Sequence, residues 1–134
     1  MKTTLKKLFT GAACGALVTL SAHAADVKQL MGKPLPELPG SEAVMLEVSY
    51  PPGEKDRVHR HDAHAFVYVL EGTIQMQLQG KPLTTVKAGE TFYEGPDDVH
   101  LIGRNASNSE PARFVVVLIK KQGAAVVKPV GEAK

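Results

Sequence analysis

The 134-residue chain contains a single cysteine, Cys14, and no tryptophan. One cysteine cannot form a disulfide within the chain, and it cannot supply a pair of redox-active thiols. The sequence also shows no Ser/His/Asp arrangement and no glycine-rich phosphate loop. These absences exclude a disulfide-stapled scaffold and leave serine hydrolase, nucleotide and dithiol chemistry without support.

No apolar run is long enough to cross a bilayer, which takes about 20 residues. The longest run, Leu8 to Leu20, follows a basic start with three lysines and precedes Ala22-His23-Ala24. Small residues at the first and last of those three positions are what a signal peptidase reads. The order of basic, apolar and small residues predicts a secretory signal peptide over 1–24. We expect cleavage after Ala24 and a periplasmic or secreted product.

An excess of basic charge is missing once the predicted signal is removed. The whole chain carries a formal charge of +2, with 16 Lys and Arg against 14 Asp and Glu. Cleavage removes 24 residues, including three lysines and Cys14, and so leaves 110 residues with a net charge of −1. No basic stripe remains for nucleic acid or for an anionic membrane. We therefore expect neither as a partner, and the remaining length is typical of one domain.

Helical periodicity is absent after residue 32, and short strand-like runs between Gly/Pro turns take its place. The predicted strands span 43–50, 66–70, 73–79, 83–86, 91–94, 100–103 and 114–121. Strands of this length and spacing predict an all-β fold, an antiparallel sandwich or barrel. The predicted layout is an extended lead-in over 25–42, a barrel domain over 43–121 and a flexible C-terminal tail over 122–134.

One predicted strand, Phe66 to Leu70, is apolar at every position. Such a strand is typically buried on both faces. One face would line the interior of the barrel, and the other needs a cover. The proline-rich lead-in and a second subunit are both open as that cover, so a homodimer is one expected assembly.

Histidines are few and concentrated. Four remain after the predicted cleavage: His59, His61, His64 and His100. His59 and His61 are two residues apart, so on an extended chain both point to the same face. His100 begins a distant predicted strand, from which it would approach the same point across the barrel. A solvated loop that happens to hold histidines is the alternative, but the spacing favours a site for one divalent transition metal such as Fe, Mn, Ni, Cu or Zn.

Two segments resemble the motifs of a known family. "PPGEKDRVHRHDAHAFVYVLEG" is similar to the first cupin motif and places His59 and His61 on its spacing. "GETFYEGPDDVHLIGRN" is similar to the second motif and contains His100. The resemblance is to small secreted single-domain cupins, and it implies a small double-stranded β-barrel, also called a jelly roll. It also implies metal binding by the motif histidines.

The sequence departs from the family pattern at Ala65, where the resemblance would place a glutamate ligand. Two arrangements stay open. In the first, His59, His61 and His100 hold the metal alone, as in cupin-like thiol dioxygenases. In the second, His64 takes the vacant position, although strand parity points it to the opposite face. An all-imidazole site leaves the +2 charge of the ion uncompensated, which favours an anionic or chelating ligand.

Tyr93 and Glu94, just before the second turn, are candidates for proton transfer, with a place in the wall or rim as the alternative. The predicted function is that of an exported small-molecule metalloenzyme, dioxygenase-like or isomerase-like. A non-catalytic metal-binding or ligand-binding barrel is the alternative, and a barrel that the metal merely stabilises is a third. An open coordination position beside a pocket would favour catalysis.

Overall fold

The structure, a computed structural model, describes residues 25–131. The predicted signal peptide, 1–24, and the last residues of the predicted tail, 132–134, lie outside the described residues. All regular structure in the described range is β-strand. The strands are β1 (Asp26–Pro34), β2 (Ser41–Tyr50), β3 (His59–Arg60), β4 (His64–Glu71), β5 (Thr73–Leu78), β6 (Thr84–Lys87), β7 (Thr91–Glu94), β8 (His100–Asn105), β9 (Ala112–Lys121) and β10 (Lys128–Pro129).

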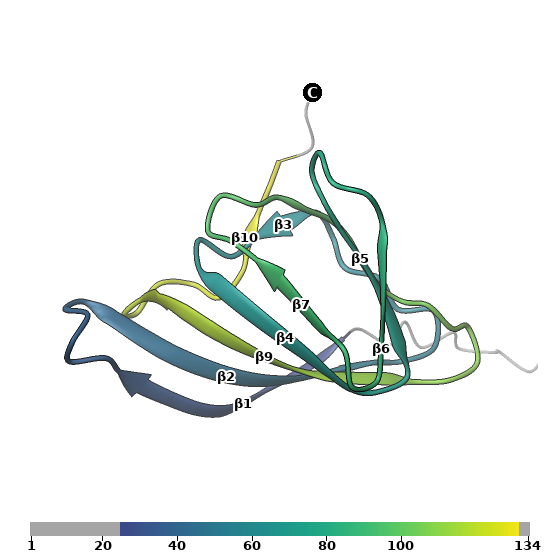
Figure 1. Cartoon of the computed structure of the whole chain (residues 1–134), viewed down its shortest axis with the longest axis horizontal. Helices are drawn as coiled ribbons and strands as arrows, with labels where there is room; N and C mark the ends of the chain where they lie inside the picture. The colour runs from purple at the N-terminus through teal and green to yellow at the C-terminus, as the bar shows by residue number, and fades with distance from the viewer. Residues whose placement is uncertain (1–24, 132–134) are drawn as a thin grey trace, which may run out of the picture.

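The strands form two five-stranded sheets that face each other (Figure 1). One sheet has the order β1-β2-β9-β4-β7, and the other has the order β10-β3-β8-β5-β6. Every pairing between named strands is antiparallel. The predicted all-β fold, a small double-stranded β-barrel, is confirmed.

The core lies between the two sheets because their strands alternate inward and outward side chains. In β2, Val44, Leu46 and Val48 are buried, whereas the residues between them are partly exposed. The same period of two runs along β9, β4 and β5. One end of this apolar interior is polar, because His59 from β3 and His100 from β8 are buried there.

The predicted lead-in does not cover the outer face of β4. It forms strand β1, which pairs with the edge of β2 over eight residue pairs. Phe66 and Tyr68 of β4 are therefore 49% and 48% exposed. Of the two covers expected for this face, the lead-in is wrong, because it pairs with the open edge of β2 instead of lying over the sheet. A second subunit stays a prediction.

The predicted tail also contains a strand. β10, at Lys128–Pro129, pairs with β3 and brings the segment before it to the polar end of the barrel. Figure 1 shows this segment in yellow, passing beside β3. Within residues 25–131, no helix has the length and apolar character that a membrane crossing requires.

Candidate metal centre

Three histidines, from β3, from the residue that follows it and from β8, meet at the polar end of the barrel. His59 lies in β3, and its backbone pairs with that of His100, the first residue of β8. His61 follows two residues after His59 and shares its inward direction. Each ring offers a nitrogen that lies within 4.8 Å of the other two. The structure thus brings together the three residues that the sequence predicts.

Backbone carbonyls fix the protonation of two of these rings. The Nδ1 atom of His59 lies 2.7 Å from the carbonyl oxygen of Arg57, and that of His61 lies 2.7 Å from the carbonyl oxygen of Val126. Since a carbonyl oxygen can only accept, each Nδ1 must donate a proton. In a neutral imidazole, Nε2 then carries a lone pair. Hydrogen-bonded orientation of this kind is typical of metal-binding histidines.

The two Nε2 atoms that remain face each other at 3.2 Å. Two lone pairs at this distance repel, so the pair cannot form a hydrogen bond while both rings are neutral. Two nitrogens bound to a tetrahedral ion at 2.0–2.1 Å lie about 3.3 Å apart. The arrangement therefore fits a shared cation.

A glycine makes room for the third ring. A Cβ atom at Gly103 of β8 would lie 3.0 Å from Cε1 of His100 and 2.9 Å from Oδ2 of Asp56. Both distances are too short for a side chain to be accommodated without a shift. The absence of a side chain at Gly103 thus leaves room for the His100 ring beside β8.

Glu94 of β7 brings a carboxylate to the same place. Its Oε1 lies 3.7 Å from Nε2 of His61, and its Oε2 lies 3.5 Å from Nδ1 of His100. The residue is 3% exposed. Burial raises the pKa of Glu94 to about 7 and lowers that of His100 to about 4.

The polar atoms of this centre are under-satisfied. Among the described residues, the buried side-chain atoms without a hydrogen-bond partner are Glu94 Oε2 and both ring nitrogens of His100. Buried polar groups in native proteins are normally paired, so each exception needs an explanation. A divalent ion held by the three imidazoles would pair with one ring nitrogen of His100 and would place a positive charge beside the carboxylate of Glu94. The residues therefore fit a divalent transition metal.

A cavity of about 310 Å³ opens from this centre into the barrel. Its walls are mostly apolar and come from Leu46, Val48, Val67, Met76, Phe114, Val116 and Leu118. A second polar feature lines it, a hydrogen bond from the Tyr50 hydroxyl to Asp56. Burial raises the pKa of both groups. A concave apolar site with a few convergent polar groups is the usual form of a small-molecule site.

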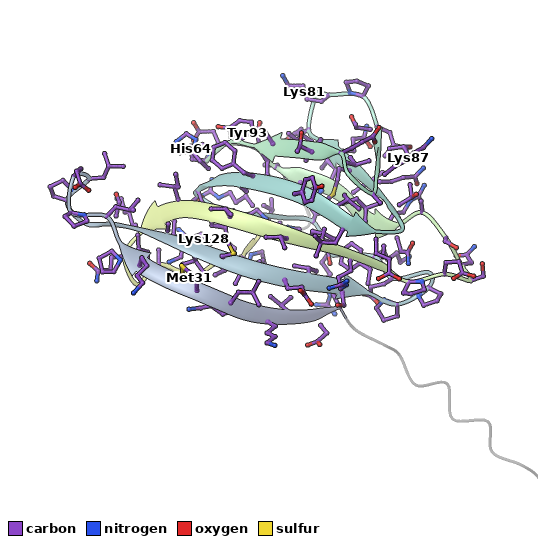
Figure 2. The ribbon with its side chains drawn as sticks, turned by 60° about the horizontal axis from the view of Figure 1, so that its bottom comes forward. Met31, His64, Lys81, Lys87, Tyr93 and Lys128 are labelled. Carbon is purple, nitrogen blue, oxygen red and sulfur yellow. The ribbon has the colours of Figure 1, made fainter. Side chains whose placement is uncertain are left out.

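His64, left open as a fourth ligand, does not reach the centre. It begins β4 on the outer face of the sheet, where its Nδ1 lies 2.7 Å from the hydroxyl of Tyr93. Figure 2 shows these two side chains together at the surface. The turn at Asp62, with a φ of 47°, does not rotate His64 inward; Ala65 takes the inward position instead.

Tyr93, one of two candidates for proton transfer, is 47% exposed and lies on the outer face with His64. It is therefore a residue of the outer surface that does not line this cavity, and its position does not support proton transfer there. Glu94, the other candidate, lines the pocket. Sequence reasoning missed the carbonyl of Val126 and the pair of Tyr50 and Asp56, because neither belongs to a histidine pattern.

The family described as Cupin domain matches residues 46–118, more than half of the chain. The chain belongs to the cupin family. No curated protein shows significant sequence similarity to this cupin.

Several solved structures share the fold at low identity. A Klebsiella pneumoniae protein with a double-stranded β-helix domain has a TM-score of 0.63 and 20% identity, over 81% of this cupin and 88% of that chain. The DMSP lyase DddQ from Ruegeria pomeroyi has a TM-score of 0.65 and 20% identity, over 81% of this cupin and 54% of that chain. The polyketide cyclase RemF from Streptomyces resistomycificus has a TM-score of 0.60 and 22% identity, over 82% of this cupin and 73% of that chain. This cupin therefore spans about half the length of DddQ.

Proposed function

We propose that this cupin is an exported metalloenzyme that binds one divalent transition metal through His59, His61 and His100. The observation that carries the proposal is the pair of Nε2 atoms of His59 and His61, which face each other at 3.2 Å while their Nδ1 atoms meet carbonyls. A bound metal would supply one of two kinds of chemistry. It would act as a Lewis acid that polarises a molecule bound in the cavity, or it would activate oxygen for reaction with that molecule. Export is inferred from the signal-like pattern over 1–24.

The substrate class follows from the walls of the cavity. Apolar side chains surround about 310 Å³, and the polar groups gather at one end. Such a site selects a small organic molecule with an apolar body and one metal-binding group, such as a carboxylate, enolate or thiolate. The chain's own residues would exclude water around the body and orient its polar group toward the histidines.

Two relatives by fold are enzymes by description, a DMSP lyase and a polyketide cyclase. Their low identity to this cupin limits the comparison to the fold. They support the general proposal that the barrel can house catalysis, whereas the reaction class proposed here, dioxygenase-like or isomerase-like, rests on the histidine site. The alternative is a metal-binding or ligand-binding barrel without turnover.

The proposal is tested by elemental analysis of protein purified from the exported fraction. We expect about one transition-metal ion per chain in the wild type and a loss of most of it in His100→Ala, because that change removes a buried ligand. The matched control is His64→Ala, which removes a histidine from the opposite face of the sheet and should leave the metal content unchanged. Equal metal content in His100→Ala and wild type would remove His100 from the site and overturn the proposal.

A further inference from the structure

The family's glutamate position is vacant in this chain, but a glutamate lies directly across from it. Ala65 of β4 pairs with Glu94 of β7 in the antiparallel register. Side chains of directly opposed residues project from the same face of the sheet, with Cβ atoms about 4.5–5.5 Å apart. Ala65 is 0% exposed and Glu94 is 3% exposed, so both face the interior. A carboxylate on either strand would enter the same part of the barrel.

We propose that Glu94 is the fourth protein ligand of the metal, supplied by the strand next to the one that carries the vacant position. The inference rests on the proposed metal site and adds to it the carboxylate that the first motif lacks. It assigns Glu94 a role in holding the ion, in place of the proton-transfer role that its sequence position suggests.

The geometry around Glu94 fits a ligand better than a hydrogen-bonding partner. Its two oxygens lie 3.7 Å from Nε2 of His61 and 3.5 Å from Nδ1 of His100. These distances are too long for good hydrogen bonds. They exceed by only a few tenths of an ångström the separation of about 3.3 Å between neighbouring ligands of a tetrahedral ion. The carboxylate therefore lies beside two of the three imidazoles without bonding to either. It lies outside the cluster that the three histidine nitrogens form by themselves, and a small movement of the side chain would bring one oxygen to an ion held there.

The charge of the site changes accordingly. Three neutral imidazoles leave a divalent ion with its full charge, whereas one carboxylate reduces the net charge of the site to +1. A monoanionic substrate group, such as a carboxylate or thiolate, would then neutralise the buried site. Glu94 thus narrows the expected substrate class from anions in general to singly charged ones.

The first test compares metal affinity by competition with a chelator. Glu94→Gln keeps the size of the side chain and removes the charge, and Glu94→Ala removes the ligand. We expect each to weaken binding by about tenfold or more, with the larger loss for alanine. The control is Glu71→Gln on β4, whose side chain is 58% exposed and pairs with Arg113, so that affinity should not change.

Visible absorption of the Co²⁺-loaded protein separates a ligand from a nearby charge. Loss of a ligand changes the geometry around the ion, and with it the position and intensity of the bands. We expect a changed spectrum in Glu94→Ala. An unchanged spectrum with wild-type affinity would overturn the role of Glu94 as a ligand.

The second test moves the carboxylate back to the family position. The double variant Ala65→Glu/Glu94→Ala exchanges the two opposed side chains and conserves their total volume, which cores tolerate best. We expect it to recover most of the metal affinity that Glu94→Ala loses. A double variant with a wild-type circular dichroism spectrum and no recovery would overturn the equivalence of the two positions.

The outcomes distinguish the two proposals. If His100→Ala abolishes metal binding while both Glu94 variants bind like wild type, the metal site stands and the present inference fails. If metal binding is unaffected by His100→Ala, the proposed function fails first. A folded Glu94→Gln protein with weaker binding and an altered Co²⁺ spectrum supports both.

Discussion

At the scale of single residues, the metal centre depends on the residues that would bind the ion and also on small residues that leave space for them. Gly103 leaves space for the ring of His100, and Ala65 leaves space for the carboxylate of Glu94. Both positions are buried, so a larger side chain has nowhere to go. Steric gaps at these two points therefore decide which donors can converge.

Gly103→Ala tests the importance of this space. The new Cβ would contact His100 Cε1 at 3.0 Å and Asp56 Oδ2 at 2.9 Å, and one of them must move. We expect a loss of about 1–3 kcal/mol in the free energy of unfolding, as for other overpacked sites, and about tenfold weaker metal binding. Urea unfolding and chelator competition measure the two effects. Gly131→Ala, with no neighbour within 4 Å, is the control and should change neither.

His59 and His61 could be predicted from the sequence because strand parity acts on neighbours two residues apart, and His100 could be predicted because it lies in the second motif that resembles the cupin pattern. The backbone carbonyls that orient the histidine rings could not be predicted. Every residue has a carbonyl, so the sequence does not show which of them accepts from a histidine. The carboxylate of Glu94 could be located only as far as the rim or wall of the pocket. Its direct opposition to Ala65 depends on the register between β4 and β7, which is set by the whole sheet.

At the scale of elements, the segment between β9 and β10 is clamped to the barrel and in turn holds His61. Lys120 of β9, whose side chain is 3% exposed, donates at 2.6 Å both to Glu42 Oε1 and to the carbonyl of Ala124. The backbone N–H of Gly123 donates to the same Glu42 oxygen. Two residues after Ala124, the carbonyl of Val126 accepts from His61. An ion pair between β9 and β2 thus helps to position one ring of the metal centre through the segment that it holds.

Glu42→Gln tests the clamp through its pH dependence. Hydrogen bonds from Lys120, and then from Gly123, hold the pKa of Glu42 below its ordinary value. A carboxylate with a lowered pKa in the folded state contributes stability above its unfolded pKa and loses it as the pH falls through the folded value. We therefore expect Glu42→Gln to be less stable than wild type near neutral pH and the difference to shrink below about pH 4. Urea unfolding across this range measures it, and a difference that is constant with pH would contradict the clamp.

The strands that the sequence failed to predict share a physical cause. β3 and β10 have two residues each, too few to show any alternation. β1 is exposed along its whole length, so no buried face imposes a pattern on it. The longer predicted strands β2, β4, β5 and β9, by contrast, bury every second residue in the core. Hydrophobic periodicity in the sequence therefore reveals strands that bury one face. Strands that are held only by pairing at a sheet edge do not show such a period.

At the scale of the whole molecule, an apolar row crosses the outer face of the first sheet. The register aligns one residue from each strand, and the row runs through Met31, Met45, Val117, Phe66 and Tyr93. Figure 2 labels its two ends, Met31 on β1 and Tyr93 on β7. Apolar residues that lie side by side on an open sheet face, with Met31, Phe66 and Tyr93 about half exposed, are typical of an interface.

A second copy of the chain is the occupant that we expect on this face. When two copies pack these sheets face to face at about 10 Å, the apolar row of one copy can lie against the same row of the other. The surface is therefore self-complementary. The charges beside it come in opposite pairs, since Arg113 meets both Glu47 and Glu71, so two copies would not repel. These features support the homodimer that the sequence of β4 predicts.

Phe66→Glu tests the dimer, because it places a charge in the row at a residue that is 49% exposed and contributes little to the core. We expect sedimentation equilibrium to give a dimer for the wild type and a monomer for the variant, since a charge buried at the centre of an interface costs about 2 kcal/mol or more in each copy. Leu101→Glu, at a residue of the other sheet that is 37% exposed, is the control and should remain dimeric.

The thermal melt of the Phe66→Glu monomer should still be cooperative, because the core between the sheets is intact. A wild-type chain that stays monomeric as its concentration rises would show instead that the row is a free surface of a single barrel.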